Sequence, residues 1–265
     1  MDAAELARRE HDNMIAADML AAGQVPHALV ERAGGFAVVA TGLPMRIFNQ
    51  VIIDGDGPTN RALAAAVTVM RARAPGRFSV TLRRGIDDSW IPVVAAIGLV
   101  RVVDRVWMPG MALHPLPAAD ESAPVPPDLD IREVADTKGV AAHIEAAAGG
   151  FDMPAAWLGA LLTEEFAGHP DVRMYAGFLD GEPVVAGAGI RSGATVGVYN
   201  IATVPSARRR GFGAAMTRRI VDDGARDGCD VATLQASAEG KPIYERLGFR
   251  TVVEYDAYSD PPDPA

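Results

Sequence analysis

The residues best suited to chemistry lie in the segment ARRRGFGAA, residues 207–215, where three arginines precede two glycines. The segment follows an apolar strand-like run and opens a helix-like one. The first N–H groups of a helix lack intrahelical partners, and the helix dipole favours negative charge at this end. Gly211 and Gly213 carry no Cβ that would keep a pyrophosphate away from the backbone. The segment therefore predicts a pyrophosphate-binding loop whose arginines neutralise the anion.

The two glycines allow two other interpretations. A dinucleotide-binding loop needs G-x-G-x-x-G, and Met216 stands where the third glycine belongs. A turn that merely starts a helix would not account for the charge around it, because residues 183–221 contain no Asp or Glu. The same stretch contains Arg191, Arg208, Arg209, Arg210, Arg218 and Arg219.

The helix that this loop opens has a clear apolar face. Phe212, Met216 and Ile220 recur every four residues, which places them on one side of a helix. We expect these residues to lie in the core rather than to contact a cofactor.

A proline-rich stretch divides the chain. Residues 114–130, HPLPAADESAPVPPDLD, contain five prolines and can neither continue a helix nor join the interior of a sheet. We therefore predict a domain over residues 1–113, a linker over 114–129, a second domain over 130–258 and a disordered tail over 259–265.

Both halves alternate strand and helix patterns, which predicts an α/β fold with mixed sheets. In the first half we expect helices over 2–22 and 60–73, and strands over 36–40, 46–54 and 78–83. In the second half we expect a strand at 130–135, two helices, and a hairpin around Asp180-Gly181, a pair typical of a type I′ turn. A strand over 195–204, a helix over 206–226, a strand over 230–237, a short helix at PIYERL and a final strand over 249–258 complete it.

Composition narrows the class of protein. No apolar run reaches the length needed to span a bilayer, and the charged N-terminus differs from a secretory signal, so we expect a cytoplasmic protein without membrane contact. The single cysteine, Cys229, excludes an intrachain disulfide, and we expect it to be a small buried residue rather than a metal ligand. The net charge of −9 argues against nucleic acid as a partner.

At this point the residues resemble the GNAT superfamily of acyl-CoA-dependent N-acyltransferases. The family's pyrophosphate loop reads Arg/Gln-x-x-Gly-x-Gly/Ala, and Arg208, Gly211 and Gly213 match that spacing. Downstream, IYERLGF (243–249) is similar to the Tyr-x-x-x-Gly-Phe segment that closes the family's domain. The resemblance implies a GNAT fold over residues 130–258.

The first half is similar in element order to the degenerate, smaller GNAT-like domain of tandem members. Where its pyrophosphate loop should be, the sequence reads DGDGPTNRA, with Asp54 and Asp56. Carboxylates there would repel a phosphate. We therefore expect this half to bind no CoA, and to pack against the other half or shape its substrate cleft.

The resemblance also implies roles for individual residues. The pantetheine arm would pair with the free edge of the 195–204 strand, and one N–H there would polarise the thioester carbonyl. Tyr244 matches the tyrosine that faces the CoA sulfur as general acid. A tyrosine pKa near 10 against a thiol near 8.5 makes full proton transfer uphill by roughly 2 kcal/mol, so a hydrogen bond to the thiolate is its main contribution. The cofactor-binding residues implied are Ile201, Ala202, Thr203, Val204, Arg208, Arg209, Arg210, Gly211, Phe212, Gly213, Ala214 and Ser237.

Two positions depart from the family pattern. Ser237 stands where many relatives have an asparagine, and Gly197 stands where some have the glutamate that serves as base. Deprotonation of the amine is therefore left to water and backbone groups, or to Asn200 or Tyr199. For His114, His143 and His169 we expect surface or capping roles.

The resemblance implies an N-acetyltransferase that moves an acetyl group from acetyl-CoA, its cosubstrate, to a primary amine by direct attack in a ternary complex, without a metal. The acidic surface favours a cationic small molecule or peptide as acceptor. The alternative is a CoA-binding regulatory or interaction module without chemistry, which the missing glutamate favours. A homodimer is left open.

Overall fold

The computed structural model describes residues 1–55, 57–102, 109–117, 125–134 and 136–261. The chain forms two compact units, each built around its own mixed sheet. The larger unit comprises Met1–Ala17 and Met111–Val252, and the smaller unit comprises Asp18–Gly110 and Val253–Ala265. The mixed α/β class predicted from the sequence is confirmed.

The sheet of the larger unit has the strand order β12-β6-β11-β10-β9-β8-β7. These strands are β6 (Gly110–Leu113), β7 (Asp130–Val134), β8 (Val172–Leu179), β9 (Glu182–Ser192), β10 (Thr195–Thr203), β11 (Val231–Gln235) and β12 (Arg250–Val253). Strands β8 and β9 form the predicted hairpin, and Asp180 and Gly181 at its turn have φ values of 51° and 89°. Strand β10 is antiparallel to β9 and parallel to β11.

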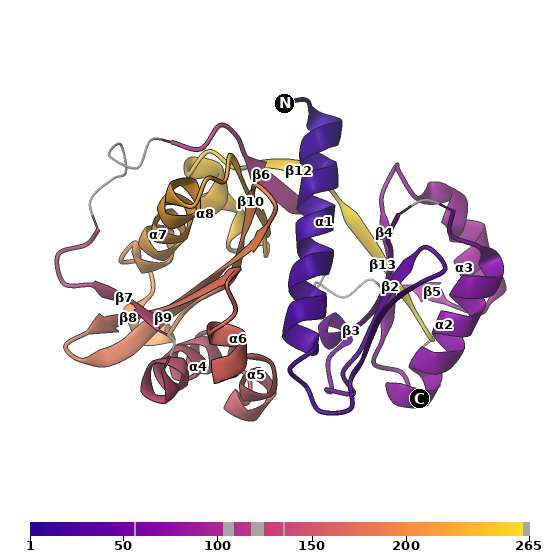
Figure 1. Ribbon diagram of the computed structural model, residues 1–265, viewed down its shortest axis with the longest axis horizontal. Coiled ribbons are helices and arrows are strands. Elements are labelled where there is room, and N and C mark those ends of the chain that lie inside the picture. The colour runs from indigo at the N-terminus through magenta and orange to yellow at the C-terminus, as the bar shows by residue number, and fades with distance from the viewer. Residues whose placement is uncertain (56, 103–108, 118–124, 135, 262–265) are drawn as a thin grey trace. The chain divides into compact units, whose positions relative to one another are not determined.

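Helices cover both faces of this sheet (Figure 1). They are α4 (Thr137–Phe151), α5 (Ala155–Leu161) and α6 (Glu164–Ala167) on one side, with α7 (Phe212–Arg226) and α8 (Lys241–Arg246) on the other. The predicted apolar face of α7 is confirmed, because Phe212, Met216 and Ile220 are all buried in the core.

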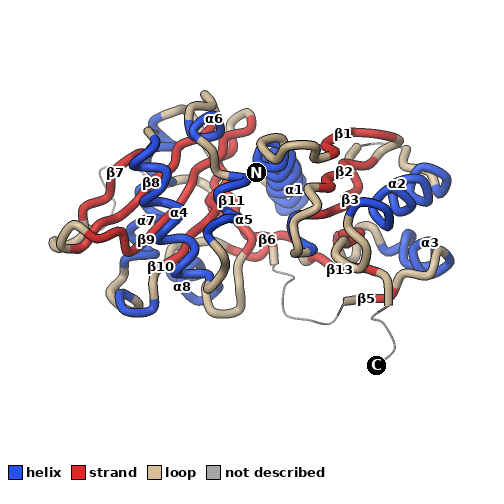
Figure 2. Tube along the Cα trace, turned by 90° about the horizontal axis from the view of Figure 1, so that it is seen from below, coloured by secondary structure: helices blue, strands red, loops and turns tan. Residues whose placement is uncertain are grey.

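The smaller unit repeats part of this plan with the strand order β1-β2-β3-β4-β13-β5. Its strands are β1 (Leu29–Ala33), β2 (Phe36–Ala40), β3 (Asn49–Ile53), β4 (Ser79–Arg83), β5 (Val100–Arg101) and β13 (Tyr255–Ser259). Helices α2 (Asn60–Arg73) and α3 (Ile91–Ala96) lie on the same side of it (Figure 2). Strand β3, helix α2 and strand β4 form a parallel crossover, as β10, α7 and β11 do in the larger unit.

Several boundaries differ from those expected. Residues 1–113 were expected to form one domain. Instead, Met1–Ala17, which include most of helix α1 (Ala3–Ala22), belong to the larger unit together with Met111–Val252. The final strand expected over 249–258 is two strands, β12 and β13, and each pairs in a different sheet. Ser259, expected in a disordered tail, is buried at the end of β13, and residues 262–265 lie outside the described part of the chain.

Three local predictions also need correction. The helix expected from Ser206 begins at Phe212, because Arg208 is extended and Arg209 and Gly211 have positive φ values. Strand β1 was not predicted. It is an edge strand whose side chains are half-buried or exposed, so its sequence has no run of apolar residues to indicate a strand. Within the expected linker, Leu116 and Leu129 pack against the core of the larger unit, and residues 118–124 are not described.

Candidate functional site

The glycine loop leaves the start of helix α7 without a side-chain cap. Gly211 is the N-cap residue, with φ 83°, and as a glycine it has no side chain to cap the first turn. The first intrahelical bond runs from the Ala215 N–H to the Gly211 carbonyl, at 2.9 Å. The N–H groups of Phe212, Gly213 and Ala214 precede that bond and therefore have no intrahelical acceptor. These donors are the group that the sequence predicts for a pyrophosphate.

The loop lies against the end of strand β10. A Cβ placed on Gly213 would be 3.5 Å from Thr203 Oγ1 and 3.6 Å from Ile201 Cγ2. A Cβ on Gly211 would meet no atom within 4 Å, so its space is open. The fold thus brings the predicted phosphate loop and the predicted pantetheine strand together.

The three arginines have different environments. Arg208 donates to the carbonyls of Thr203 at 3.1 Å and Gly150 at 2.8 Å, so it ties the end of β10 to the end of α4. Arg210 pairs with Asp128 and lies over the ring of Phe212. Arg209 is exposed and has no side-chain partner among the described residues. Of the three, Arg209 is the cation most accessible to an anion.

Strands β10 and β11 form a fork. They pair only from Thr195 to Gly197 and from Val231 to Thr233, and then separate. A bulge follows on β10 between Tyr199 and Ala202, where Asn200 has a φ of 54°. The β10 backbone beyond the bulge has no pairing with β11, which is the edge predicted for the pantetheine arm.

Val204 differs from the other predicted backbone groups. Its N–H donates to the Val184 carbonyl at 3.0 Å, and its own carbonyl accepts from Ala207. Both groups are therefore occupied within the protein. This leaves Ile201, Ala202 and the N–H of Thr203 as the stronger candidates, since the Thr203 carbonyl accepts from Arg208.

Tyr244 lies on α8 and packs against the same core cluster as Ile201 and Val204. Its ring meets Phe249 edge-on, with centroids 6.0 Å apart. Its hydroxyl has no hydrogen-bond partner in the described part of the chain, and burial raises the pKa of Tyr244 to about 12. Ser237 lies nearby, because a Cβ on Gly240 would be 3.0 Å from the Tyr244 ring and 3.2 Å from Ser237 Oγ. Ser237 itself caps the turn into α8 by accepting the Gly240 N–H at 3.0 Å.

The position of the missing glutamate is filled from the N-terminus. A Cβ on Gly197 would lie 1.9 Å from Oδ1 of Asn13, on helix α1. Glu10, also on α1, is fully buried and accepts a hydrogen bond from Gln235 at the end of β11. Sequence analysis did not identify either residue. The one feature of the sequence that could have indicated Glu10 and Asn13 is that they are polar residues on the otherwise apolar face of a helix.

The histidine predictions were partly wrong. His143 is fully buried rather than exposed, and its Nδ1 lies 2.9 Å from the Tyr175 carbonyl. Burial lowers its pKa to about 4, so it is a neutral core residue. His169 has the expected capping role, because its Nδ1 accepts the Asp171 N–H at 3.2 Å. Cys229 is buried, as predicted.

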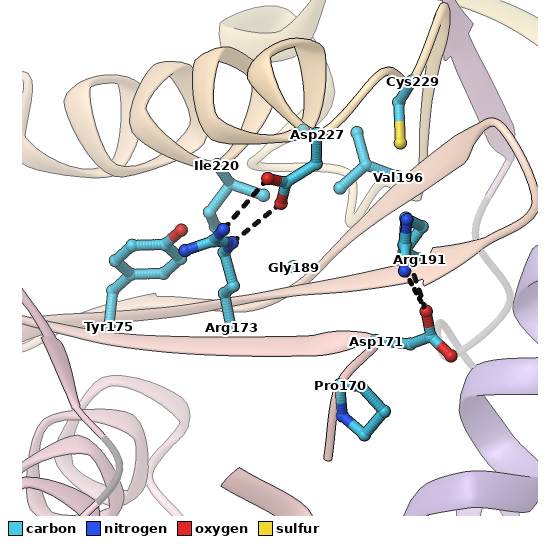
Figure 3. Close-up of a pocket in the computed structure, with 11 residues that line it drawn as sticks. Pro170, Asp171, Arg173, Tyr175, Gly189, Arg191, Val196, Ile220, Asp227 and Cys229 are labelled. Carbon is cyan, nitrogen blue, oxygen red and sulfur yellow. Dashed lines mark hydrogen bonds and ion pairs between the residues drawn. The ribbon is translucent and has the colours of Figure 1, made fainter. Parts of the chain in front are cut away.

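A separate pocket lies at the other end of α7 (Figure 3). Its charged lining is internally paired, Arg173 with Asp227 and Arg191 with Asp171, each at 2.8 Å. Helix α7 has 15 residues, which separates this pocket from Gly211 by roughly 20 Å. None of the predicted site residues lines it.

The described residues contain neither a metal-ligand cluster nor a membrane-spanning helix. No group of three or more His, Cys, Asp or Glu side chains could hold a metal ion. None of the helices there combines the length and hydropathy of a membrane-spanning segment.

Comparison with known proteins identifies the domain. Residues 170–251 match the family model described as acetyltransferase (GNAT) domain. No curated protein matches the sequence significantly. Among solved structures, a GCN5-related N-acetyltransferase from Kribbella flavida is 18% identical with a TM-score of 0.68, covering 97% of this chain and 96% of that one.

Two other structures extend the comparison. A tandem GNAT protein from the clavulanic acid biosynthesis pathway is 15% identical with a TM-score of 0.61, covering 100% of this chain and 98% of that one. A putative GNAT-family acetyltransferase from Novosphingobium aromaticivorans is 16% identical with a TM-score of 0.56, covering 88% and 92%. At these identities the likeness establishes the fold. The chain therefore has the tandem GNAT fold, and its residues 170–251 match the acetyltransferase (GNAT) domain.

Proposed function

We propose that the protein transfers an acetyl group from acetyl-CoA to a primary amine of a small molecule or peptide, by direct attack in a ternary complex. The observation that carries the proposal is the uncapped start of α7, held against the free edge of β10 within a GNAT domain. The amides of the loop would bind the diphosphate, and Arg209 would supply a cation. The backbone of Ile201, Ala202 and Thr203 would bind the pantetheine arm.

The smaller unit differs from the larger one at the start of the corresponding helix. Its corresponding helix, α2, has a side-chain cap, because Thr59 Oγ1 accepts the Ala62 N–H at 3.2 Å. Asp54, in the loop before it, pairs with Arg32. A filled cap and a nearby carboxylate disfavour a bound diphosphate. We therefore assign the coenzyme to the larger unit alone.

The chemistry follows from the fork and Tyr244. The amine nitrogen forms a bond to the thioester carbonyl carbon, an N–H of the β10 edge stabilises the oxyanion, and the C–S bond then breaks. With a pKa of about 12, Tyr244 is a weaker acid than the thiol by about 3.5 units, so complete proton transfer is uphill by about 5 kcal/mol. Tyr244 therefore stabilises the leaving thiolate by donating a hydrogen bond, and the proton that the amine loses ends on the sulfur.

The charge of the chain bears on the acceptor. Residues 128–265 hold 13 basic and 21 acidic side chains, a net charge of −8. A negative field raises the local concentration of cations. This favours an acceptor that carries positive charge, such as a polyamine-like small molecule or a basic peptide.

The proposal is tested by two measurements on the full chain. Calorimetry with acetyl-CoA reports binding, and release of free CoA in the presence of a panel of primary amines reports turnover. Binding together with amine-dependent release supports the transferase. Binding without release on any amine favours the alternative, a CoA-binding module, for which the absence of a carboxylate at Gly197 is the supporting observation. No heat with acetyl-CoA overturns both.

A further inference from the structure

Each sheet contains one strand from the other half of the sequence. In the larger sheet β6, which precedes the proline-rich stretch, lies between β11 and β12. In the smaller sheet β13, from the end of the chain, lies between β4 and β5. Figure 1 shows the purple β6 beside the yellow β12. The larger unit is thus completed by a strand that the sequence places in the first half.

The place of β6 decides where helix α8 crosses the sheet. The chain runs from β11 through α8 to β12, and these two strands flank β6. Neighbouring strands lie about 4.8 Å apart, so β6 holds β11 and β12 roughly 10 Å apart. Helix α8, which carries Tyr244, lies on the connection across that gap. The position of Tyr244 therefore depends on a strand that lies outside the connection itself.

One side chain of β6 lies against the end of α8. Side chains alternate along a strand, so Met111 and Leu113 are on the same face of β6. Met111 is fully buried in the core cluster that includes Phe212 and Met216 of α7, and Leu113 packs against that cluster. A Cβ on Gly248 would be 3.1 Å from Leu113 Cδ1. Leu113 therefore directly supports the turn that follows α8.

This turn is joined to Tyr244 through both the backbone and a ring contact. The Phe249 N–H donates to the Tyr244 carbonyl at 3.0 Å, and the Gly248 N–H donates to the Glu245 carbonyl at 3.1 Å. The buried ring of Phe249 also meets the ring of Tyr244. Gly248 has a φ of 93°, which favours glycine and leaves no side chain between Leu113 and the turn. A shift of the turn would therefore move Tyr244.

From these contacts we infer that the first half of the chain supplies a positioning residue of the proposed active site: Leu113, on β6, supports the turn after α8 and so sets the position of the Tyr244 hydroxyl. The inference rests on the proposed function, in which that hydroxyl donates to the leaving thiolate. Leu113 acts through Tyr244 and touches no substrate. The start of α7 and the edge of β10 are not part of this chain of contacts, so acetyl-CoA binding does not depend on it.

Kinetics test this role of Leu113. Leu113→Ala should lower kcat several-fold with the KM for acetyl-CoA unchanged, whereas Leu113→Met, which keeps the volume, should retain turnover. In a Tyr244→Phe background Leu113→Ala should lower kcat no further, because the hydroxyl is already absent. The control is Leu63→Ala, in the core of the smaller unit, which should lower Tm and leave kcat unchanged. An equal effect of Leu113→Ala in both backgrounds, or an equal loss of kcat in Leu63→Ala, would overturn the inference.

A second measurement does not depend on acetyl transfer. Hydrogen exchange of the full chain reports the amides of Leu247, Gly248 and Phe249, which donate within the turn. Leu113→Ala should speed their exchange several-fold and leave the Ala215 amide, at the start of α7, unchanged. Leu113→Val should give a smaller change in the same direction, and it serves as the test if the alanine variant does not fold. Faster exchange in a protein that transfers no acetyl group would refute the proposed function and still support the contact, whereas unchanged exchange at the turn would overturn the inference.

Discussion

Substitutions of Gly211 can test whether a negatively charged ligand binds at the start of α7, separately from any effect on the shape of the loop. Its φ is 83° and a Cβ there would meet no atom within 4 Å, so a substitution strains the backbone without a collision at the Cβ. Gly211→Ala and Gly211→Glu should therefore lose similar stability, about 1 kcal/mol each. They differ in the carboxylate and in the methylene group that carries it.

The expected difference follows from Coulomb's law. A carboxylate about 5 Å from one phosphate charge is unfavourable by about 1 kcal/mol in water and about 3 kcal/mol at an effective dielectric constant of 20. Gly211→Glu should therefore bind acetyl-CoA about 5-fold to 150-fold more weakly than Gly211→Ala. The gap should narrow in 1 M salt, where the Debye length is about 3 Å.

The assay is calorimetry with acetyl-CoA at low and high salt, with Tm measured alongside. Gly193→Glu is the matched control, because Gly193 also has a positive φ, 57°, and open space around it, but it lies at the opposite end of β10. It should weaken binding little. Equal affinity of the Gly211→Ala and Gly211→Glu proteins would refute the assignment of the diphosphate to this loop.

Three further predictions follow from single side chains. Tyr244→Phe should slow turnover roughly 10-fold and leave acetyl-CoA affinity and Tm unchanged, because its hydroxyl has no partner in the described structure; unchanged turnover in a CoA-release assay would remove Tyr244 from the mechanism. Arg208→Ala should lower Tm, because two backbone carbonyls lose their donor. Arg209→Ala should instead weaken acetyl-CoA binding a few-fold without changing Tm. Calorimetry and thermal melts of both variants check this, and the reverse result would contradict it. Burial lowers the pKa of His143 from 6.5 to about 4, so as pH falls the unfolded chain binds a proton before the folded chain does. The free energy of unfolding is therefore unaffected by His143 above pH 6.5, and it falls by about 3 kcal/mol between pH 6.5 and pH 4. Urea unfolding across that range should show a shallower loss in His143→Gln, and an equal slope in both proteins would contradict this.

Features set by neighbouring residues could be predicted from the sequence. The Asp180-Gly181 turn, the buried face of α7 and the loop around Gly211 and Gly213 each depend on residues within a few positions. Local backbone preferences and helical periodicity act over that range. For the same reason the motif of the GNAT loop was recognisable before the fold was known.

Contacts between distant segments were decided by the tertiary structure alone. Asn13 reaches Gly197 across more than 180 residues of chain, and two consecutive strands, β12 and β13, pair in different sheets. The partners of Arg208 and Arg210 are likewise set by the fold, and they turn two predicted phosphate ligands into side chains with other contacts. The physical reason is that a side chain is satisfied by whichever groups packing brings within reach, and residue type alone carries no information about which groups those are.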